Sequence, residues 1–206
     1  MNFEAGELYH VYNQGNNREP IFYEDKNYLF FLGKMKTHLL KHSDILAWCL
    51  MPNHFHWLIR IHDNYVNEPT EKIDNLSAPI VLPMNRSIST LLSSYTKAMN
   101  RMYKRSGKLI RSKTKAKPLN KSSEKDDLYP LICFNYIHQN PLKAGLVKHL
   151  EDWEFSSFRD FAGIRNGNLC DIKLATELLD LPDDANDFLK QSYLSIPHEL
   201  QERLFL

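Results

Sequence analysis

The stretch LMPNHFHWLIRI, residues 50–61, decides how the rest of the chain is interpreted. The apolar residues 45–51 lead into it, and Pro52 with Asn53 supplies turn chemistry, so a hairpin is predicted. Side chains of a strand alternate between its two faces. His54 and His56 therefore share one face, and the bulky face that we assign to the core carries Phe55, Trp57, Ile59 and Ile61.

Two imidazoles side by side on a rigid strand form half of a binding site for a divalent cation. The alternative is that they are ordinary structural histidines, because an isolated His-x-His pattern is common. The tight turn before His54 and the aromatic stripe on the opposite face favour the metal site. A third ligand must then come from another part of the chain.

The residues before this hairpin predict one strand and one helix. Residues 8–13 are aromatic and β-branched, as in a strand, and residues 14–17 form a loop with Arg18 just beyond. Asp25 is a candidate cap for a helix over residues 25–42. The order strand, helix, strand, strand predicts an antiparallel sheet crossed by a helix, which is the α+β class.

The clearest helix of the sequence is predicted over residues 85–105. Its apolar residues recur at steps of three and four, and its other side is basic. The basic character continues beyond the helix, and the only acidic residue in 86–125 is Glu124. A polyanion such as a nucleic-acid backbone is the expected partner, with a merely solvated surface as the alternative. The cations expected to contact DNA are Lys97, Arg101, Arg105, Arg111, Lys113 and Lys115.

A third helix is predicted from Asp126 to Asn140, with Pro141 as its end. Tyr136 and Asn140 are four residues apart and so lie on one face of that helix. Tyr136 also borders the apolar stripe of the helix, so periodicity alone assigns its side chain to the core. His138 points elsewhere, which favours a structural role or a DNA contact over a metal ligand.

Composition sets broad limits on the class of protein. The chain has 206 residues, a formal net charge of +1 and three cysteines. The length predicts one domain, or one domain with appendages. The cysteines are far apart and in no metal-binding spacing, which predicts reduced, buried thiols inside a cell. No signal peptide or membrane-spanning run is recognisable, so a cytoplasmic protein is expected.

Together these motifs resemble the REP-associated tyrosine transposases of the single-tyrosine HUH nuclease superfamily. Three separate motifs occur in the right order, and the resemblance covers residues 9–163. The motifs are YHVYN (9–13) with GNNR (15–18), MPNHFH (51–56), and YIH (136–138) with NP (140–141) and AGLV (144–147). Trp153 with SSF (156–158) also fits the usual ending of the family.

The resemblance implies a ferredoxin-like antiparallel sheet with helices packed on it, a catalytic domain over residues 1–165 and a helical appendage over 166–206. It implies an enzyme that cleaves and rejoins single-stranded DNA near hairpins through a 5′-phosphotyrosine. The implied nucleophile is Tyr136, the implied ligands of Mg²⁺ or Mn²⁺ are His54, His56 and Asn140, and the implied DNA contacts include Asn13 and Arg18. Members work as monomers or homodimers, and a DNA-bound protein would be associated with the nucleoid.

Two features depart from the family pattern. Gln14 stands where members often carry an arginine, and residues 109–115 replace an aromatic-rich strand. Two other functions also remain open. One is a non-catalytic nucleic-acid-binding protein derived from this fold, and the other is a hydrolase of small phosphoesters that uses the same histidines.

Overall fold

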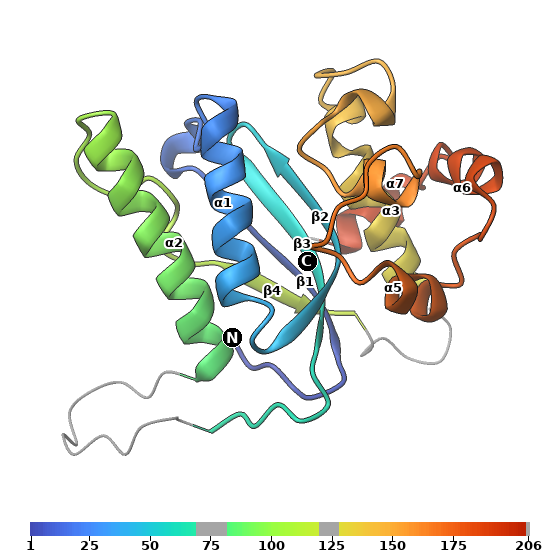
Figure 1. The fold of residues 1–206 in the computed structure, drawn as a ribbon, viewed down its shortest axis with the longest axis horizontal. Coiled ribbons are helices and arrows are strands. Elements are labelled where there is room, and N and C mark those ends of the chain that lie inside the picture. The colour runs from blue at the N-terminus through green and yellow to red at the C-terminus, as the bar shows by residue number, and fades with distance from the viewer. Residues whose placement is uncertain (69–81, 120–127, 205–206) are drawn as a thin grey trace.

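The computed structural model describes residues 1–68, 82–119 and 128–204, and its centre is a four-stranded sheet (Figure 1). The strands are β1 (Leu8–Gln14), β2 (Ser43–Met51), β3 (His54–Ile61) and β4 (Lys115–Pro118). They lie in the order β2-β3-β1-β4, and every neighbouring pair is antiparallel. The predicted hairpin is thus β2 and β3, and β4 is an edge strand that follows residues 109–114.

One face of the sheet is covered by α1 (Asp25–His38) and α2 (Pro83–Met102). The element order β-α-β-β-α-β with this strand order is the ferredoxin-like arrangement, so the predicted α+β class is confirmed. Phe55, Trp57 and Ile59 point into this layer and share its core with Phe31 and Met35 of α1. The alternation predicted for β3 therefore holds.

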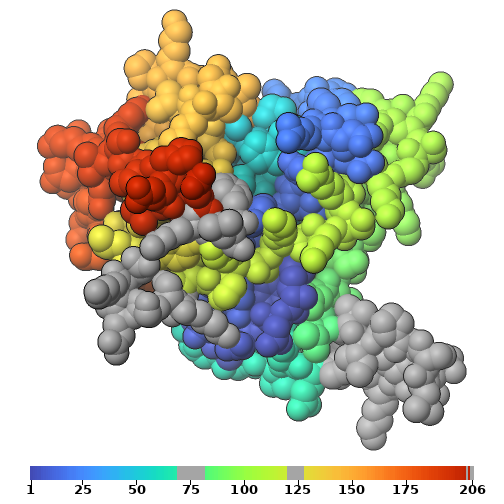
Figure 2. Space-filling model, turned by 180° about the vertical axis from the view of Figure 1, so that it is seen from behind, coloured from blue at the N-terminus to red at the C-terminus, as the bar shows by residue number. Residues whose placement is uncertain are grey.

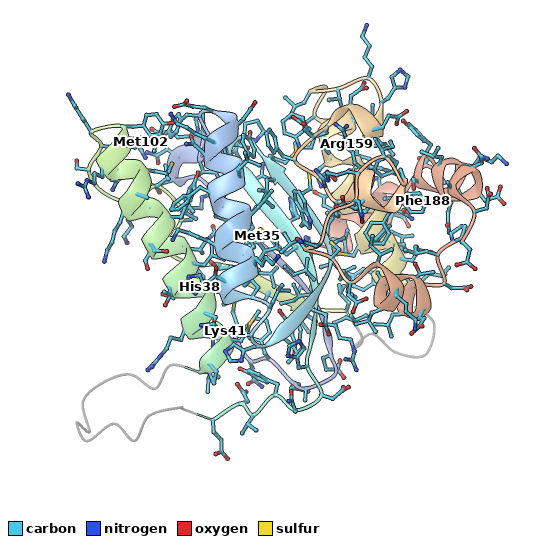
Figure 3. The ribbon with its side chains drawn as sticks, in the orientation of Figure 1. Met35, His38, Lys41, Met102, Arg159 and Phe188 are labelled. Atoms are coloured by element: carbon cyan, nitrogen blue, oxygen red, sulfur yellow. The ribbon has the colours of Figure 1, made fainter. Side chains whose placement is uncertain are left out.

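The other face of the sheet is covered by α3 (Tyr129–Lys143) and the helices that follow it. Cys133, Phe134 and Ile137 of α3 pack in a second core with Cys49 and Leu58 of the sheet. Figure 3 shows the two layers through labelled side chains, with Met35 and Met102 on one side of the sheet and Arg159 and Phe188 on the other. The later elements are η2 (Leu150–Asp152), α4 (Phe158–Phe161), α5 (Ile172–Leu179), α6 (Ala185–Ser192) and α7 (His198–Arg203), and η1 (Asn16–Arg18) follows β1.

The prediction that Pro141 ends the third helix is wrong. The helix continues through Pro141 to Lys143, and the Ala144 amide still donates to the Asn140 carbonyl at 2.9 Å. Proline removes one backbone N–H and its ring crowds the carbonyl four residues earlier, and packing of α3 on the sheet compensates for both costs. The predicted start at Asp126 lies outside the described residues.

The segments after α4 pack onto the same second core. Ala175 of α5, Phe188 of α6 and Leu204 after α7 are all buried there. The division into residues 1–165 and 166–206 stays a prediction. Within the described residues, no helix combines the length and apolarity that crossing a membrane requires.

An ion pair between a buried carboxylate and a half-buried guanidinium fixes the segment between α4 and α5. Asp160 is almost fully buried and accepts hydrogen bonds from Arg165 Nε at 2.7 Å and Nη2 at 2.9 Å. Removing Asp160 takes the counter-ion from Arg165, whose side chain is 31% exposed and still donates to the Glu154 and Ser156 carbonyls, and it leaves the Gly167 amide without its acceptor. We expect Asp160→Ala to lower the free energy of unfolding by about 1–3 kcal/mol, measured by urea denaturation.

The matched control for this variant is Asp187→Ala, which breaks an exposed pair with Lys190. Exposed ion pairs contribute only about 0–1 kcal/mol because water and salt screen them. Equal losses of stability in the two variants would mean that the Asp160–Arg165 pair contributes no more to stability than an exposed pair.

Candidate functional site

A cavity of about 290 Å³ opens on the face of the sheet that α3 covers, and we call it the histidine cavity. Its lining comes from β1, β3, the chain around β4, and α3, and none of the described lining residues is acidic. The lining residues are Tyr12, Asn13, Gln14, His54, His56, Arg111, Lys113, Lys115 and Tyr136. The cavity thus combines imidazoles, phenols and cations.

The strand register places a third histidine beside the two predicted ones. Tyr12 lies opposite His56 in the β1–β3 ladder, so His10 shares that face of the sheet. His10 Nε2 and His56 Nδ1 are 2.9 Å apart, which makes one ring the donor and the other the acceptor. The sequence left the face of His10 undecided, because that face depends on the register between two distant strands.

Burial keeps these imidazoles neutral. It lowers the pKa of His10 to about 3, and it lowers the pKa of His56 well below the usual value, with further contributions from His10 and His54. The pKa of His54 is also lowered by burial, against an opposing hydrogen bond with Asn140. Neutral imidazoles carry the lone pair that a metal ligand needs.

Tyr136 lies on the same side of the sheet as these histidines. Its ring centroid is 5.6 Å from that of His56 and 6.2 Å from that of His10, edge to face in both cases. Burial raises the pKa of Tyr136 to about 12, and a hydrogen bond with Asn140 opposes this shift. The phenol is therefore protonated at neutral pH.

Asn140 connects the phenol to the histidines. Its Nδ2 donates to the backbone carbonyl of Tyr136 at 2.9 Å, one turn earlier in α3. Its side chain also bonds to His54 and to the Tyr136 hydroxyl. The predicted set of two histidines, a tyrosine and an asparagine is thus brought together from β3 and α3.

The donor set has the chemistry of a divalent cation site of low charge. No group of three or more His, Cys, Asp or Glu suited to a metal occurs among the described residues. Two neutral imidazoles and an amide oxygen can still hold a divalent cation. His54 Nδ1 is 2.6 Å from Asn53 Oδ1 and His56 Nδ1 is bonded to His10, so Nε2 of each ring is the atom for a ligand bond.

The cations predicted to bind DNA fall into two groups. Arg111, Lys113 and Lys115 line the histidine cavity. Lys97 and Arg101 are exposed on α2 outside it, and Arg105 is bonded to Glu19 at 3.3 Å. Arg18 is exposed beside the β2–β3 turn, where its backbone carbonyl accepts a hydrogen bond from Asn53.

Asn13 lines the cavity but is buried, and its amide is occupied within the protein. Its Nδ2 donates to the Arg111 carbonyl and to Thr114 Oγ1, both at 2.9 Å. Asn13 thus holds the segment that carries Arg111 and Lys113 against β1. The DNA contact expected of Asn13 stays a prediction.

Sequence reasoning missed Tyr12, Gln14 and the partner of Gln14. When the Gln14 amide is turned so that its oxygen faces Arg111, this oxygen accepts from Nη2 at 2.6 Å and Nε at 3.0 Å. The Arg111 guanidinium therefore lies against the side chain of Gln14. Alternation along β1 places Tyr12 and Gln14 with His10, but only the register shows that this face is the site.

His138, for which the sequence predicts a structural role or a DNA contact, lies outside the cavity. It is buried, and its Nε2 is 2.8 Å from Ser157 Oγ, which also bonds to the backbone of Trp48 in β2. Burial lowers the pKa of His138 to about 3. This contact ties α3 to β2 and helps to fix the position of Tyr136.

The depressed pKa of His138 predicts instability in acid. A histidine takes up a proton near pH 6.5 when unfolded but near pH 3 here, so stability is complete above pH 6.5 and falls toward pH 3. Each pH unit in this window costs up to about 1.4 kcal/mol per such histidine. Urea denaturation between pH 7.5 and 4 should show this slope, and His138→Gln should reduce it.

Comparison with known proteins rests on structure. No family model matches the sequence, and no curated protein matches it. A solved structure of a REP-associated tyrosine transposase bound to a REP hairpin matches with a TM-score of 0.55, 18% sequence identity and 96% coverage of each chain. The chain is therefore similar in fold, over nearly its whole length, to a REP-associated tyrosine transposase.

Proposed function

We propose that this protein cleaves and rejoins single-stranded DNA near hairpins, with Tyr136 as the nucleophile. The observation that supports this most strongly is that Tyr136 shares one cavity with His54, His56 and three cations. A cavity with phenol, imidazole and guanidinium groups but no described carboxylate suits a phosphodiester. The similar structure holds a REP hairpin, which makes DNA hairpins the first substrates to test.

The reaction is a transesterification at phosphorus. The Tyr136 hydroxyl loses its proton as its oxygen bonds to the scissile phosphate, and the bond to the 3′-oxygen breaks. The strand is then joined to Tyr136 through its 5′-phosphate, and the departing 3′-oxygen takes up a proton. Attack by another 3′-hydroxyl reverses these steps, so joining needs no nucleotide cofactor.

Residues of β3 and α3 would hold the cation that this reaction needs. His54 and His56 supply imidazole nitrogens, and Asn140 supplies its amide oxygen. When bound, Mg²⁺ or Mn²⁺ withdraws charge from a phosphate oxygen and favours departure of the 3′-oxygen. On ligand preference alone, two imidazoles and an amide suit Mn²⁺ better than Mg²⁺.

The remaining lining residues would bind the substrate. Arg111, Lys113 and Lys115 neutralise phosphates, and Gln14 orients the Arg111 guanidinium. Tyr12 is stacked on His10, with ring centroids 4.7 Å apart, and offers a face for a base. We assign this activity to residues 1–165.

A covalent-adduct assay tests the proposal. The protein is incubated with a panel of single strands that carry hairpins, with Mg²⁺ or Mn²⁺, and adducts are separated by denaturing electrophoresis. We expect a protein–DNA adduct that carries the 5′-phosphate side of the cleaved strand and is absent in EDTA. Mass spectrometry of the digested adduct should place the phosphate on Tyr136.

The other candidate functions predict different outcomes of this assay. A non-catalytic nucleic-acid-binding protein would bind the strands without cleavage or adduct on any of them. A hydrolase of small phosphoesters would hydrolyse its substrate without forming a covalent protein–DNA adduct. Either result would contradict the proposal.

A further inference from the structure

A second cavity, of about 620 Å³, lies between α2 and residues 107–114, and we call it the α2 groove. Figure 2 shows the yellow-green chain between α2 and β4 crossing this face of the molecule, beside the dark blue N-terminal residues. Arg111 and Lys113 line both the α2 groove and the histidine cavity. The two cavities therefore adjoin at these side chains.

The shape of the α2 groove follows from the sequence of α2. Small hydroxyl residues recur along one side of the helix, and their short side chains leave the surface hollow. The floor is apolar where Ile88, Leu92 and Ile110 meet. The polar residues of α2 that line the groove are Asn85, Ser89, Ser93, Thr96, Lys97 and Asn100. Asn85 and Asn100 each donate one amide hydrogen to a backbone carbonyl of the protein, and the second hydrogen of each amide can donate to a phosphate oxygen, as can the hydroxyls of Ser89 and Thr96.

The opposite wall is fixed to the strand that carries His10 and Tyr12. The amide of Asn16 donates to the Leu109 carbonyl at 2.8 Å, and the amide of Arg111 donates to the Gln14 carbonyl at 3.0 Å. Asn13 holds the Arg111 carbonyl and Thr114 from the same side. The spacing between the groove and the histidine cavity is therefore set by backbone contacts.

The charged residues that line the α2 groove are all basic. Lys97, Lys108 and Lys113 are exposed and make no ion pair with any carboxylate among the described residues. None of the described residues that line the groove is acidic. By contrast, Arg105 lies outside the groove and its charge is partly neutralised by Glu19. Such a surface attracts a polyanion.

We propose that the α2 groove binds the single-stranded DNA that leads into the histidine cavity. This inference rests on the proposed function, because it identifies the strand as the one that carries the scissile phosphate. The described lining of the groove contains no aromatic side chain on which bases could stack. Binding here is therefore through phosphates, without sequence preference and with strong dependence on salt.

Oligothymidylates test the groove without knowledge of the target sequence. Their affinities are measured by fluorescence anisotropy in EDTA, for lengths of about 4 to 16 nucleotides. For the intact protein we expect affinity to rise with length. Lys97→Glu with Lys108→Glu should lower the affinity for the longest strand by about 10-fold or more and reduce its salt slope by about 1.4.

Two matched controls show whether a loss of affinity comes from the groove itself or from any change in charge or in side-chain size. Lys41→Glu with Lys148→Glu makes the same charge change at exposed residues outside the groove lining. Ser93→Trp fills the groove without a change of charge, and Thr90→Trp adds the same bulk at an exposed position of α2 outside it. Only the Lys97/Lys108 and Ser93 variants should lose affinity.

Three results would overturn the inference. One is an equal loss of affinity in the groove variants and in their controls. The second is unchanged affinity in the groove variants, and the third is equally tight binding of duplexes of the same length.

Failure of the groove and failure of the proposed function are distinguishable. If the adduct forms but groove variants bind oligothymidylates normally, only the groove inference is wrong. If the groove variants lose affinity but no strand gives an adduct, only the nuclease proposal is wrong.

Discussion

Tyr136→Phe should abolish covalent adduct formation and strand cleavage while the affinity for single-stranded DNA stays within about 3-fold. The substitution removes one oxygen and leaves the ring that packs against His56 and His10. Loss of a nucleophile typically lowers kcat by about 10⁴-fold or more, because no other group forms the covalent intermediate. Affinity changes little because phosphate contacts come from Arg111, Lys113 and Lys115.

The matched control is Tyr12→Phe, because Tyr12 lines the same cavity and stacks on His10. It removes the same oxygen at a position where the proposed reaction needs only a ring face. We expect Tyr12→Phe to keep adduct formation. Loss of the adduct in Tyr12→Phe with retention in Tyr136→Phe would assign the nucleophile to β1 and contradict the proposed mechanism.

The raised pKa of Tyr136 adds a kinetic expectation. Burial favours the neutral phenol, so the proton must be removed as the bond to phosphorus forms. In single-turnover experiments with saturating Mn²⁺, the rate of adduct formation should rise with pH between 6 and 9. A rate independent of pH in this range would show that proton loss from Tyr136 does not limit the reaction.

Local patterns predicted the parts of the fold that depend on neighbouring residues. The faces of β3 follow from the strand period of two, and its aromatic residues occupy the first core as expected. The pairing of Tyr136 with Asn140 follows in the same way from one helical turn. Both features are set by residues fewer than ten positions apart.

The parts that sequence reasoning missed depend on contacts between distant segments. His10 faces His56 only because β1 and β3 pair in one particular register, and these two histidines are 46 positions apart in the sequence. Gln14 meets Arg111 because the chain after α2 returns to the end of β1. The hydrophobic period and the secondary-structure propensities of a segment do not predict either of these contacts. The α2 groove arises from the same return of the chain toward β1.

His54→Ala should remove cation binding and strand cleavage together. The substitution deletes one of the two imidazoles proposed as ligands, and it leaves His56 and its partner His10 in place. Loss of a residue that merely supports a ligand costs about 10–100-fold in metal affinity, so loss of a ligand should cost at least that. Calorimetry with Mn²⁺ in the absence of DNA measures this directly.

The matched control is His62→Ala, which removes an imidazole just beyond the end of the same strand. His62 contacts Asp44 and lies outside the histidine cavity, so cation binding and cleavage should survive. Thermal denaturation of both variants shows whether the fold is intact.

Affinity for oligonucleotides decides how the result of His54→Ala is interpreted. The phosphate-binding cations come from the chain around β4 and from α2, and among the described residues none of them forms a hydrogen bond or ion pair with His54. Cleavage should therefore be lost while most of the DNA affinity remains. A comparable loss of both would mean that the cation itself holds the strand. The histidines would then be part of the DNA-binding surface. The proposal that β3 and α3 carry out the reaction while the basic segment binds the DNA would be wrong.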